Sequence, residues 1–302
     1  INEGFTKYTP ASGTLELKKA ICEKFSKDNG LSYLPENIVV SNGAKHSLIN
    51  VFGAILNPGD EVIIPAPYWV SYPEMVKYCD GVPKVLYTKE ENGFKFSAED
   101  LRSAITEKTR AIVLNSPSNP TGMVYTREEL KEIADVAVEN NIYVVSDEIY
   151  EYLVYDGLEH VSIASFGDKI KDLTIIVNGV SKTYAMTGWR IGYTASNASI
   201  AKAMSNVQSH TTSNPNSIAQ AATVTALKGP KDDLEMMIKA FDERRKYMAD
   251  RINSIDGVSC LTPQGAFYVM MNISELKGRK IAGRVIETAD DFAGVFLDEE
   301  LV

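Results

Sequence analysis

Short apolar runs alternate with longer amphipathic segments along most of the chain. The runs at 111–115, 142–146 and 173–177 are rich in Val, Ile and Leu, which is typical of strands buried on both faces of a parallel sheet. Between such runs apolar residues recur at helical spacing, and Gly, Pro and Asn mark the turns. We predict strands at 37–40, 61–64, 82–88, 111–115, 142–146, 173–177 and 191–194, and helices at 14–27, 46–56, 72–78, 97–105, 127–139, 199–208 and 217–227.

The chain changes character after residue 228. A long charged helix is predicted at about 232–255, followed by strands at 258–261 and 266–271 and a helix from Asp290. Because strands and helices alternate before that point, we predict an α/β fold whose mostly parallel sheet is covered by helices on both faces. The predicted domains are a large one at 1–228 and part of a smaller α+β one at 229–302.

One lysine stands where a reactive amine would be displayed. Lys182 follows the predicted strand 173–177, which Asn178-Gly179 is expected to end with a turn. Ligands of open α/β sheets bind at the carboxyl ends of the strands. A lysine there, next to Ser181 and followed by Arg190, suggests a cofactor that has an anionic group and is bound covalently through its aldehyde; pyridoxal phosphate fits that description. The alternative is an ordinary surface lysine.

A second candidate is the turn at 41–45, Ser-Asn-Gly-Ala-Lys, between a predicted strand and a predicted helix. Backbone amides at the start of a helix bind phosphate groups, because the helix dipole and the free N–H groups both favour an anion. The turn is therefore a predicted phosphate cradle.

Composition excludes several other classes of function. A net charge of −9 and a pI near 5.0 argue against nucleic acid or an anionic membrane as partner. The three cysteines are widely spaced, which suggests neither a disulfide framework nor a Cys-based metal site, so we expect a reducing, cytoplasmic location. His46, His160 and His210 lack metal-ligand spacing, and we expect no metal site. No apolar run reaches the roughly 18 to 20 residues of a membrane-spanning helix.

Several further motifs occur in order along the chain. They are Tyr8-Thr-Pro-Ala-Ser-Gly13, Asn42-Gly-Ala-Lys-His46, Pro65-Ala-Pro-Tyr-Trp-Val-Ser-Tyr-Pro73, Asn119-Pro-Thr-Gly122, Asp147-Glu-Ile-Tyr150, and Ser181-Lys182 with Met186-Thr-Gly-Trp-Arg190-Ile-Gly. Together they resemble the class I and II pyridoxal-phosphate-dependent aminotransferases, and among these the bacterial aspartate aminotransferase branch. The likeness extends over nearly the whole chain and implies a fold-type-I transferase.

The resemblance implies a role for each residue around the cofactor ring. Lys182 would form the Schiff base and then move a proton between substrate Cα and cofactor C4′. Asp147 would pair with the pyridine nitrogen and keep it protonated. Tyr150 and Asn119 would donate to the phenolic oxygen, and Trp69 would stack on the ring. In the alternative, Asp147 is a capping residue, Asn119 forms a turn and Trp69 packs in the core.

The same resemblance implies which residues bind the cofactor phosphate and which bind the substrate. The cofactor phosphate would rest on Ser181, on Arg190 and on the turn formed by Gly43, Ala44 and Lys45.

Trp69, Asn119 and Lys45 would also contact the substrate, with the Lys45 ammonium on a distal carboxylate; a solvated lysine at a helix start is the alternative. Tyr8 would reach the phosphate of a neighbouring subunit, which implies a homodimer with shared active sites. Glu148 is expected to face away from Asp147, since neighbours in a strand alternate sides.

The activity that the resemblance implies is transfer of the amino group of L-aspartate to 2-oxoglutarate, by a ping-pong scheme through pyridoxamine phosphate. The alternatives are an aromatic amino acid or prephenate aminotransferase, a pyridoxal-phosphate-dependent lyase or synthase, and the cofactor-sensing module of a transcription regulator. The family's arginine for the substrate α-carboxylate is expected beyond Val302, and a substrate-binding glycine loop is expected before Ile1.

Overall fold

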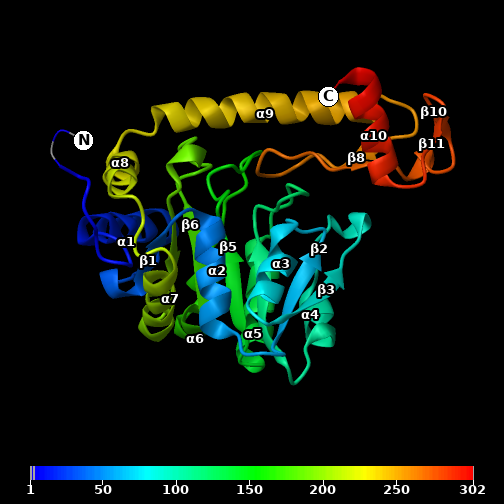
Figure 1. Cartoon of the computed structure of the whole chain (residues 1–302). Helices are drawn as coiled ribbons and strands as arrows, with labels where there is room; N and C mark the ends of the chain where they lie inside the picture. The colour runs from blue at the N-terminus through cyan, green and yellow to red at the C-terminus, as the bar shows by residue number, and fades with distance from the viewer. Residues whose placement is uncertain (1, 3, 302) are drawn as a thin grey trace.

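The computed structural model describes residues 2 and 4–301, and a seven-stranded sheet forms its centre (Figure 1). The strand order is β1-β7-β6-β5-β4-β2-β3. Strand β7 is antiparallel to both of its neighbours, and the other pairs are parallel. The predicted mostly parallel α/β sheet is confirmed. Its strands are β1 (Ile38–Ser41), β2 (Glu61–Ala66), β3 (Val82–Tyr87), β4 (Thr109–Asn115), β5 (Tyr143–Asp147), β6 (Thr174–Gly179) and β7 (Gly192–Ala195).

Helices cover both faces of this sheet, because side chains of each strand alternate between two apolar layers. Val62 of β2 packs with Phe52 in the layer formed by α2, α3 and α7. Its neighbour Ile63 packs with Ile133 in the opposite layer, formed by α4, α5 and α6, and α1 extends that second layer over β1 and β7. The helices are α1 (Leu15–Asn29), α2 (Ala44–Ile55), α3 (Ser71–Tyr78), α4 (Ala98–Ala104), α5 (Arg127–Glu139), α6 (Asp168–Leu173), α7 (Ala198–Thr211) and α8 (Ser217–Lys228).

The predicted turn at Asn178-Gly179 is wrong, because both residues belong to β6. They pair with Tyr193 and Gly192 of the antiparallel strand β7. A Cβ on Gly179 would lie 2.8 Å from the carbonyl oxygen of Ile191, so glycine here permits close approach of two strands and does not end one. The chain leaves the sheet only after this residue. Helix α6 was not predicted, since its six residues are too few for a clear periodic pattern.

Helix α9 (Asp232–Asn253) is the predicted long charged helix, and Figure 1 shows it running from α8 to the last elements of the chain. These are β8 (Ser259–Cys260), β9 (Met271–Asn272), β10 (Lys280–Ile281), β11 (Arg284–Val285) and α10 (Ala289–Glu300). The division into domains at 228 stays a prediction.

The predicted strand 266–271 is largely wrong, since only Met271 lies in a strand. Ala266 has a left-handed backbone with φ of 57°. Its N–H donates to Leu153 O, and the N–H of Gly265 donates to Gly122 O. Since the first residue of the run has this conformation and bonds to a loop of the sheet, the run does not begin as a strand.

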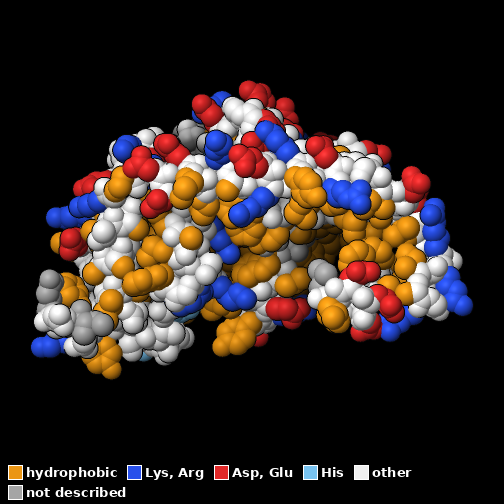
Figure 2. Space-filling model, turned by 90° about the horizontal axis from the view of Figure 1, so that it is seen from above, with side chains coloured by type: hydrophobic (Ala, Val, Ile, Leu, Met, Phe, Trp, Pro, Cys, Tyr) orange, Lys and Arg blue, Asp and Glu red, His pale blue; other side chains and the backbone are white. Residues whose placement is uncertain are grey.

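The face seen in Figure 2 carries hydrophobic side chains around a hollow, with acidic and basic side chains beside them. On α9, Met236 and Tyr247 are among the exposed apolar residues. Within the described residues, none of the helices combines the length and the apolar character that crossing a membrane would require.

Candidate active site

A cavity of about 200 Å³ lies at the carboxyl ends of β4, β5 and β6, beside the first turn of α2. All the predicted site residues except Gly43 and Tyr8 line it. The lining residues are Ala44, Lys45, Trp69, Tyr72, Asn115, Asn119, Asp147, Ile149, Tyr150, Ser181, Lys182, Thr187, Arg190 and Tyr268. The topology therefore brings together residues that are far apart in the sequence, at the edge where open α/β sheets bind ligands.

Asp147, the last residue of β5, is 4% exposed and forms part of the cavity wall. Its Oδ2 accepts a hydrogen bond from the Tyr72 hydroxyl at 2.7 Å, and Oδ1 accepts one from the Ile149 N–H at 3.3 Å. Burial raises the pKa of Asp147 to about 6, although these hydrogen bonds and the charge of Lys182 lower it. Among the described residues no cation lies within ion-pair distance of this carboxylate, so a protonated nitrogen of a ligand would be a suitable partner.

Lys182 is half-buried and follows β6 closely in the chain. Its Nζ lies 5.9 Å from the ring centroid of Tyr150 and 5.6 Å from that of Phe267. Burial lowers the pKa of Lys182, the charge of Arg190 lowers it further, and Asp147 opposes both effects. An amine with a lowered pKa is more often unprotonated near neutral pH, so it can act as a nucleophile or as a base.

Arg190 lies beside the N-terminus of α2 with a left-handed backbone, φ 55°. Its Nη1 donates to Thr187 O at 2.7 Å and its Nη2 to Asn42 O at 3.4 Å. A Cβ on Gly43 would lie 2.1 Å from Nη2, so the guanidinium can occupy this place only next to glycine. Within residues 2 and 4–301 the guanidinium forms no ion pair, which leaves its charge available to an anion.

The first turn of α2 lies beside the Arg190 guanidinium and adds backbone N–H donors to it. Gly43 is the N-cap, and the amides of Ala44 and Lys45 precede the first intrahelical hydrogen bonds. A Cβ on Gly192 of β7 would lie 2.3 Å from the nitrogen of Ala44, so that strand approaches the helix end closely. The hydroxyl of the buried Ser181 is a further donor at the cavity wall. Together these groups form an anion site of the kind that helix N-termini provide.

Trp69 gives the cavity a flat aromatic wall. Its ring meets that of Tyr72 edge to face, with the centroids 5.4 Å apart, and the Nζ of Lys45 lies 4.8 Å from its centroid. Lys45 is exposed as a residue, but its side chain lines the cavity. A cation over an indole face is a favourable contact, and it keeps the ammonium beside the cavity.

Tyr150 and Asn119 both contact a third residue, Tyr268, which lies 118 residues after Tyr150 and 149 residues after Asn119 in the sequence. The hydroxyls of Tyr150 and Tyr268 lie 2.7 Å apart, and Nδ2 of Asn119 donates to the Tyr268 hydroxyl at 3.3 Å. The loop that carries Asn119 is fixed by a 2.8 Å bond from its N–H to Oδ1 of Asn115. Tyr8, in contrast, is 88% exposed and does not line the cavity.

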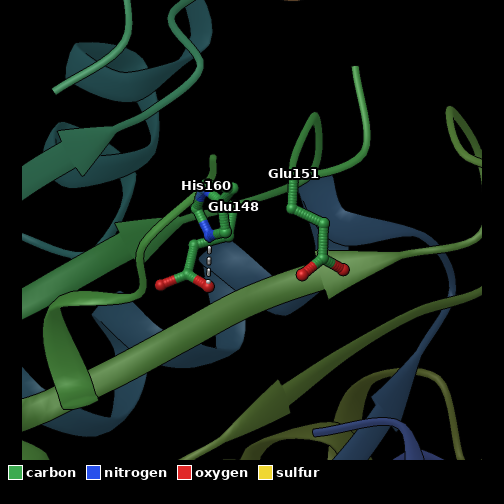
Figure 3. Close-up of side chains that lie close together, drawn as sticks. All are labelled: Glu148, Glu151 and His160. Carbon is green, nitrogen blue, oxygen red and sulfur yellow. Dashed lines mark hydrogen bonds and ion pairs between the residues drawn. The ribbon is translucent and has the colours of Figure 1, made fainter. Parts of the chain in front are cut away.

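Glu148 points away from the cavity, as the alternation of strand side chains predicts. Its Oε1 accepts hydrogen bonds from Ser146 at 2.9 Å and from Ser162 at 2.7 Å, and its Oε2 lies 3.1 Å from Nε2 of His160 (Figure 3). The side chains of Asp147 and Glu148 therefore lie on opposite sides of the backbone at the end of β5, and only that of Asp147 lines the cavity.

Glu148, Glu151 and His160 offer three ligand atoms within 4.8 Å of one another, a spacing that a metal ion could use. However, the ammonium of Lys24 pairs directly with Glu151, which also accepts a 2.7 Å hydrogen bond from Asn178. Burial raises the pKa of Glu151, but the charge of Lys24 and the hydrogen bonds from Lys24 and Asn29 act in the opposite direction, and the pKa is lowered overall. Lys24 thus supplies a positive charge to Glu151, Glu148 is satisfied by hydrogen bonds, and the cluster is a buried ion and hydrogen-bond network.

Two important contacts escaped prediction from the sequence. Tyr72 was assigned only to a helix, although its position three residues after Trp69 could have placed both rings on one side of that turn. Tyr268 gave no local signal, because it meets Tyr150 across 118 residues of sequence. Asn115, Ile149 and Thr187 also line the cavity without having been singled out.

The cavity fits the cofactor that the sequence predicts. An anion site lies at the start of α2. The buried carboxylate at the end of β5 forms no ion pair within residues 2 and 4–301, and an amine of lowered pKa follows β6. These suit the phosphate, the ring nitrogen and the aldehyde of pyridoxal phosphate, while Trp69 suits its ring face.

Comparison with known proteins gives a family match over the whole chain. The family model described as "Aminotransferase class I and II" matches residues 1–302. The chain is 52% identical to an aspartate aminotransferase of Bacillus sp. (strain YM-2), over 99% of this chain and 75% of that protein. It is 51% identical to an aspartate aminotransferase of Bacillus subtilis (strain 168), over 100% and 76%. The crystal structure of an aspartate aminotransferase from Rhizobium meliloti has a TM-score of 0.96 and 45% identity, over 99% of this chain and 75% of that one.

Proposed function

Since the chain belongs to the class I and II aminotransferases, we propose that it transfers the amino group of L-aspartate to 2-oxoglutarate, forming oxaloacetate and L-glutamate. It is a transaminase that depends on pyridoxal 5′-phosphate. The observation that carries the choice of aspartate is the 51–52% identity, over essentially the whole chain, to relatives that are named aspartate aminotransferases.

The residues that hold the cofactor follow from the cavity's chemistry. Arg190, Ser181 and the amides of Ala44 and Lys45 hold the phosphate, because together they provide a guanidinium fork and neutral donors at a helix end. Gly43 makes this possible, since any side chain there would displace the guanidinium.

The ring is held by a second group of residues. Asp147 pairs with the ring nitrogen, which supplies the cation that this buried carboxylate lacks among the described residues. Trp69 covers one face of the ring, and Tyr150 and Asn119 donate to the phenolic oxygen. The support for these roles is that all four side chains line one cavity and that each provides the chemical group its role needs.

Lys182 carries the reaction. When bound, pyridoxal phosphate supplies a ring that accepts the electron pair left on substrate Cα after deprotonation. Lys182 attaches the cofactor through Nζ, and after release by the substrate amine the same nitrogen takes the proton from substrate Cα. Its lowered pKa favours both tasks, because the unprotonated amine is the reactive form.

Lys45, whose ammonium group lies at the cavity wall, selects the substrate. Lys45 places its ammonium over Trp69, where it can meet the distal carboxylate of a dicarboxylic amino acid, and Trp69 and Asn119 contact the rest of the substrate. A substrate without that carboxylate would leave the ammonium without its anion.

The proposed active form is a homodimer. Tyr8 is 88% exposed and lies outside the cavity of its own chain, which suits a residue that reaches the phosphate site of a second copy. The three free cysteines suit a reducing compartment, and we place the protein in the cytoplasm.

The function is tested by steady-state kinetics with 2-oxoglutarate as acceptor. We expect kcat/KM to be highest for L-aspartate, with parallel double-reciprocal plots and equal amounts of oxaloacetate and L-glutamate. A higher kcat/KM for phenylalanine, or for prephenate with an amino donor, would instead identify an aromatic or prephenate aminotransferase. Elimination products without a new amino acid would identify a lyase.

A further inference from the structure

We propose that Tyr268 is a positioning residue that sets the direction of the Tyr150 hydroxyl proton. The inference rests on the proposed function, in which Tyr150 donates to the phenolic oxygen of the cofactor. Tyr150 and Asn119 are the two proposed donors to that oxygen, and Tyr268 would be a third residue that acts with them. It comes from the segment between α9 and β9 and not from a loop of the sheet.

The hydrogen bonds around Tyr268 suggest a direction for the contact between the two hydroxyls, in which either oxygen could donate. Nδ2 of Asn119 is an amide nitrogen that can only donate, so the Tyr268 oxygen accepts from it at 3.3 Å. We assign the Tyr268 proton to the 2.7 Å contact with the Tyr150 oxygen. The Tyr150 proton is then free to point into the cavity. Because a hydroxyl that accepts a hydrogen bond becomes a better donor, this chain strengthens the bond from Tyr150 to an acceptor.

Tyr268 can do this because its segment is held firmly against the loops of the sheet. The N–H of Gly265 donates to Gly122 O at 2.7 Å, and that of Ala266 donates to Leu153 O at 2.8 Å. A Cβ on Gly122 would lie 3.0 Å from Gly265 O and 3.2 Å from Tyr268 O, so the two backbones are in close contact. Loop 119–122 thus carries one hydrogen-bond partner of Tyr268 and also anchors its backbone.

The rings of Tyr150 and Tyr268 pack edge to face, with centroids 5.8 Å apart and planes at 84°. The titratable groups that face the two phenols are Asp147 at the end of β5, Tyr72 from α3 and Lys182 after β6. Asp147 and Tyr72 are already bonded to each other. Among these groups, Tyr268 is therefore the one placed to orient the Tyr150 hydroxyl.

The test measures a property of the lysine-bound cofactor other than turnover. The full chain is loaded with pyridoxal 5′-phosphate, and the midpoint of the pH titration of its visible absorption is recorded. The variants are Tyr268→Phe, Tyr150→Phe and the double variant. The matched control is Tyr155→Phe, since the Tyr155 hydroxyl bonds Ala266 O in the same segment without reaching the cavity.

A donor to the phenolic oxygen disfavours the proton that this oxygen shares with the lysine nitrogen, so loss of a donor raises the midpoint. We expect Tyr150→Phe to raise it, Tyr268→Phe to raise it by roughly 10–30% of that shift, and Tyr155→Phe to leave it unchanged. In the Tyr150→Phe background, Tyr268→Phe should add nothing.

A Tyr268→Phe midpoint equal to the wild-type value would overturn the inference. So would an equal shift in Tyr155→Phe, which would mean a general loosening of the segment, or a shift that persists without the Tyr150 hydroxyl. Wild-type chain that takes up no cofactor would instead refute the proposed function, and the inference with it.

Discussion

The hydroxyl of Tyr72 donates a 2.7 Å hydrogen bond to Oδ2 of Asp147, so helix α3 holds the carboxylate that ends β5. Both side chains are buried, and the bond lowers the pKa of Asp147 against the stronger effect of burial. Tyr72 therefore favours the charged carboxylate that a protonated ring nitrogen requires.

Removing this bond should weaken cofactor binding. For Tyr72→Phe we expect the dissociation constant of pyridoxal phosphate to rise about tenfold to a hundredfold, because a hydrogen bond to a charged group contributes about 1.5–3 kcal/mol. Quenching of Trp fluorescence in the apo-protein measures the binding. Tyr33→Phe is the control, since the buried Tyr33 hydroxyl has no hydrogen-bond partner among the described residues. An affinity within twofold of wild type would show that Tyr72 does not support Asp147.

Asp147 should destabilise the apo-protein at neutral pH. Its pKa is about 6 in the folded chain and 3.8 ordinarily, so its contribution to stability is present below pH 3.8 and is lost as pH rises through about 6. Asp147→Asn removes this pH dependence. The apo variant should be more stable than wild type by up to about 3 kcal/mol at pH 8, with a smaller difference at pH 5.

Urea unfolding of both apo-proteins between pH 5 and pH 8 checks this expectation, and cofactor affinity should fall in the same variant. A stability difference that does not change with pH would contradict the raised pKa of Asp147.

Gly43 should be needed for the anion site and not only for the turn. Gly43→Ala puts a Cβ 2.1 Å from the Arg190 guanidinium, whereas Gly59 has a similar φ of 88° with open space around it. Both Ala variants should lose about 1–3 kcal/mol of stability, because residues other than glycine rarely adopt such a positive φ. Only Gly43→Ala should also lose affinity for pyridoxal phosphate, while affinity for unphosphorylated pyridoxal stays unchanged. Equal losses of phosphate-ester affinity in the two variants would argue against the cradle.

Lys45 should determine the preference for an acidic side chain. For Lys45→Met we expect kcat/KM for aspartate to fall about tenfold to a hundredfold, because one charge-assisted hydrogen bond is lost, while that for phenylalanine changes little. Lys202→Met, at an exposed position on α7, is the control. A parallel fall for both substrates would mean that Lys45 acts on the cofactor and not on the substrate.

The sequence predicted those parts of the fold that depend on local patterns. The β-branched runs that became β4, β5 and β6 are apolar on both faces, so their burial in a parallel sheet followed directly. Lys182 and the turn that contains Ala44 were singled out because they follow strands at the edge where ligands bind. The resemblance to the aminotransferases supplied the other candidates, such as Asp147, and the topology brings it into the same cavity as Lys182 and Ala44.

What could not be predicted depends on contacts distant in sequence. Gly179 looked like a turn because glycine favours turns, but the close approach of β7 gives it a different role. The apolar run at 266–271 looked like a strand, yet its first residue, Ala266, has a left-handed backbone and bonds through its amide to Leu153 O. Tyr268 enters the cavity only because of that docking, so its role is visible only in the folded chain.

The central claim is that Lys182 carries the cofactor and exchanges it for the substrate amine. Reduction of the pyridoxal-phosphate-loaded protein with borohydride, followed by peptide mass mapping, tests it most directly. The reduced cofactor should be found on the peptide that contains Lys182, and prior addition of aspartate should largely prevent the labelling. Label on another lysine such as Lys45, or none at all, would contradict the account.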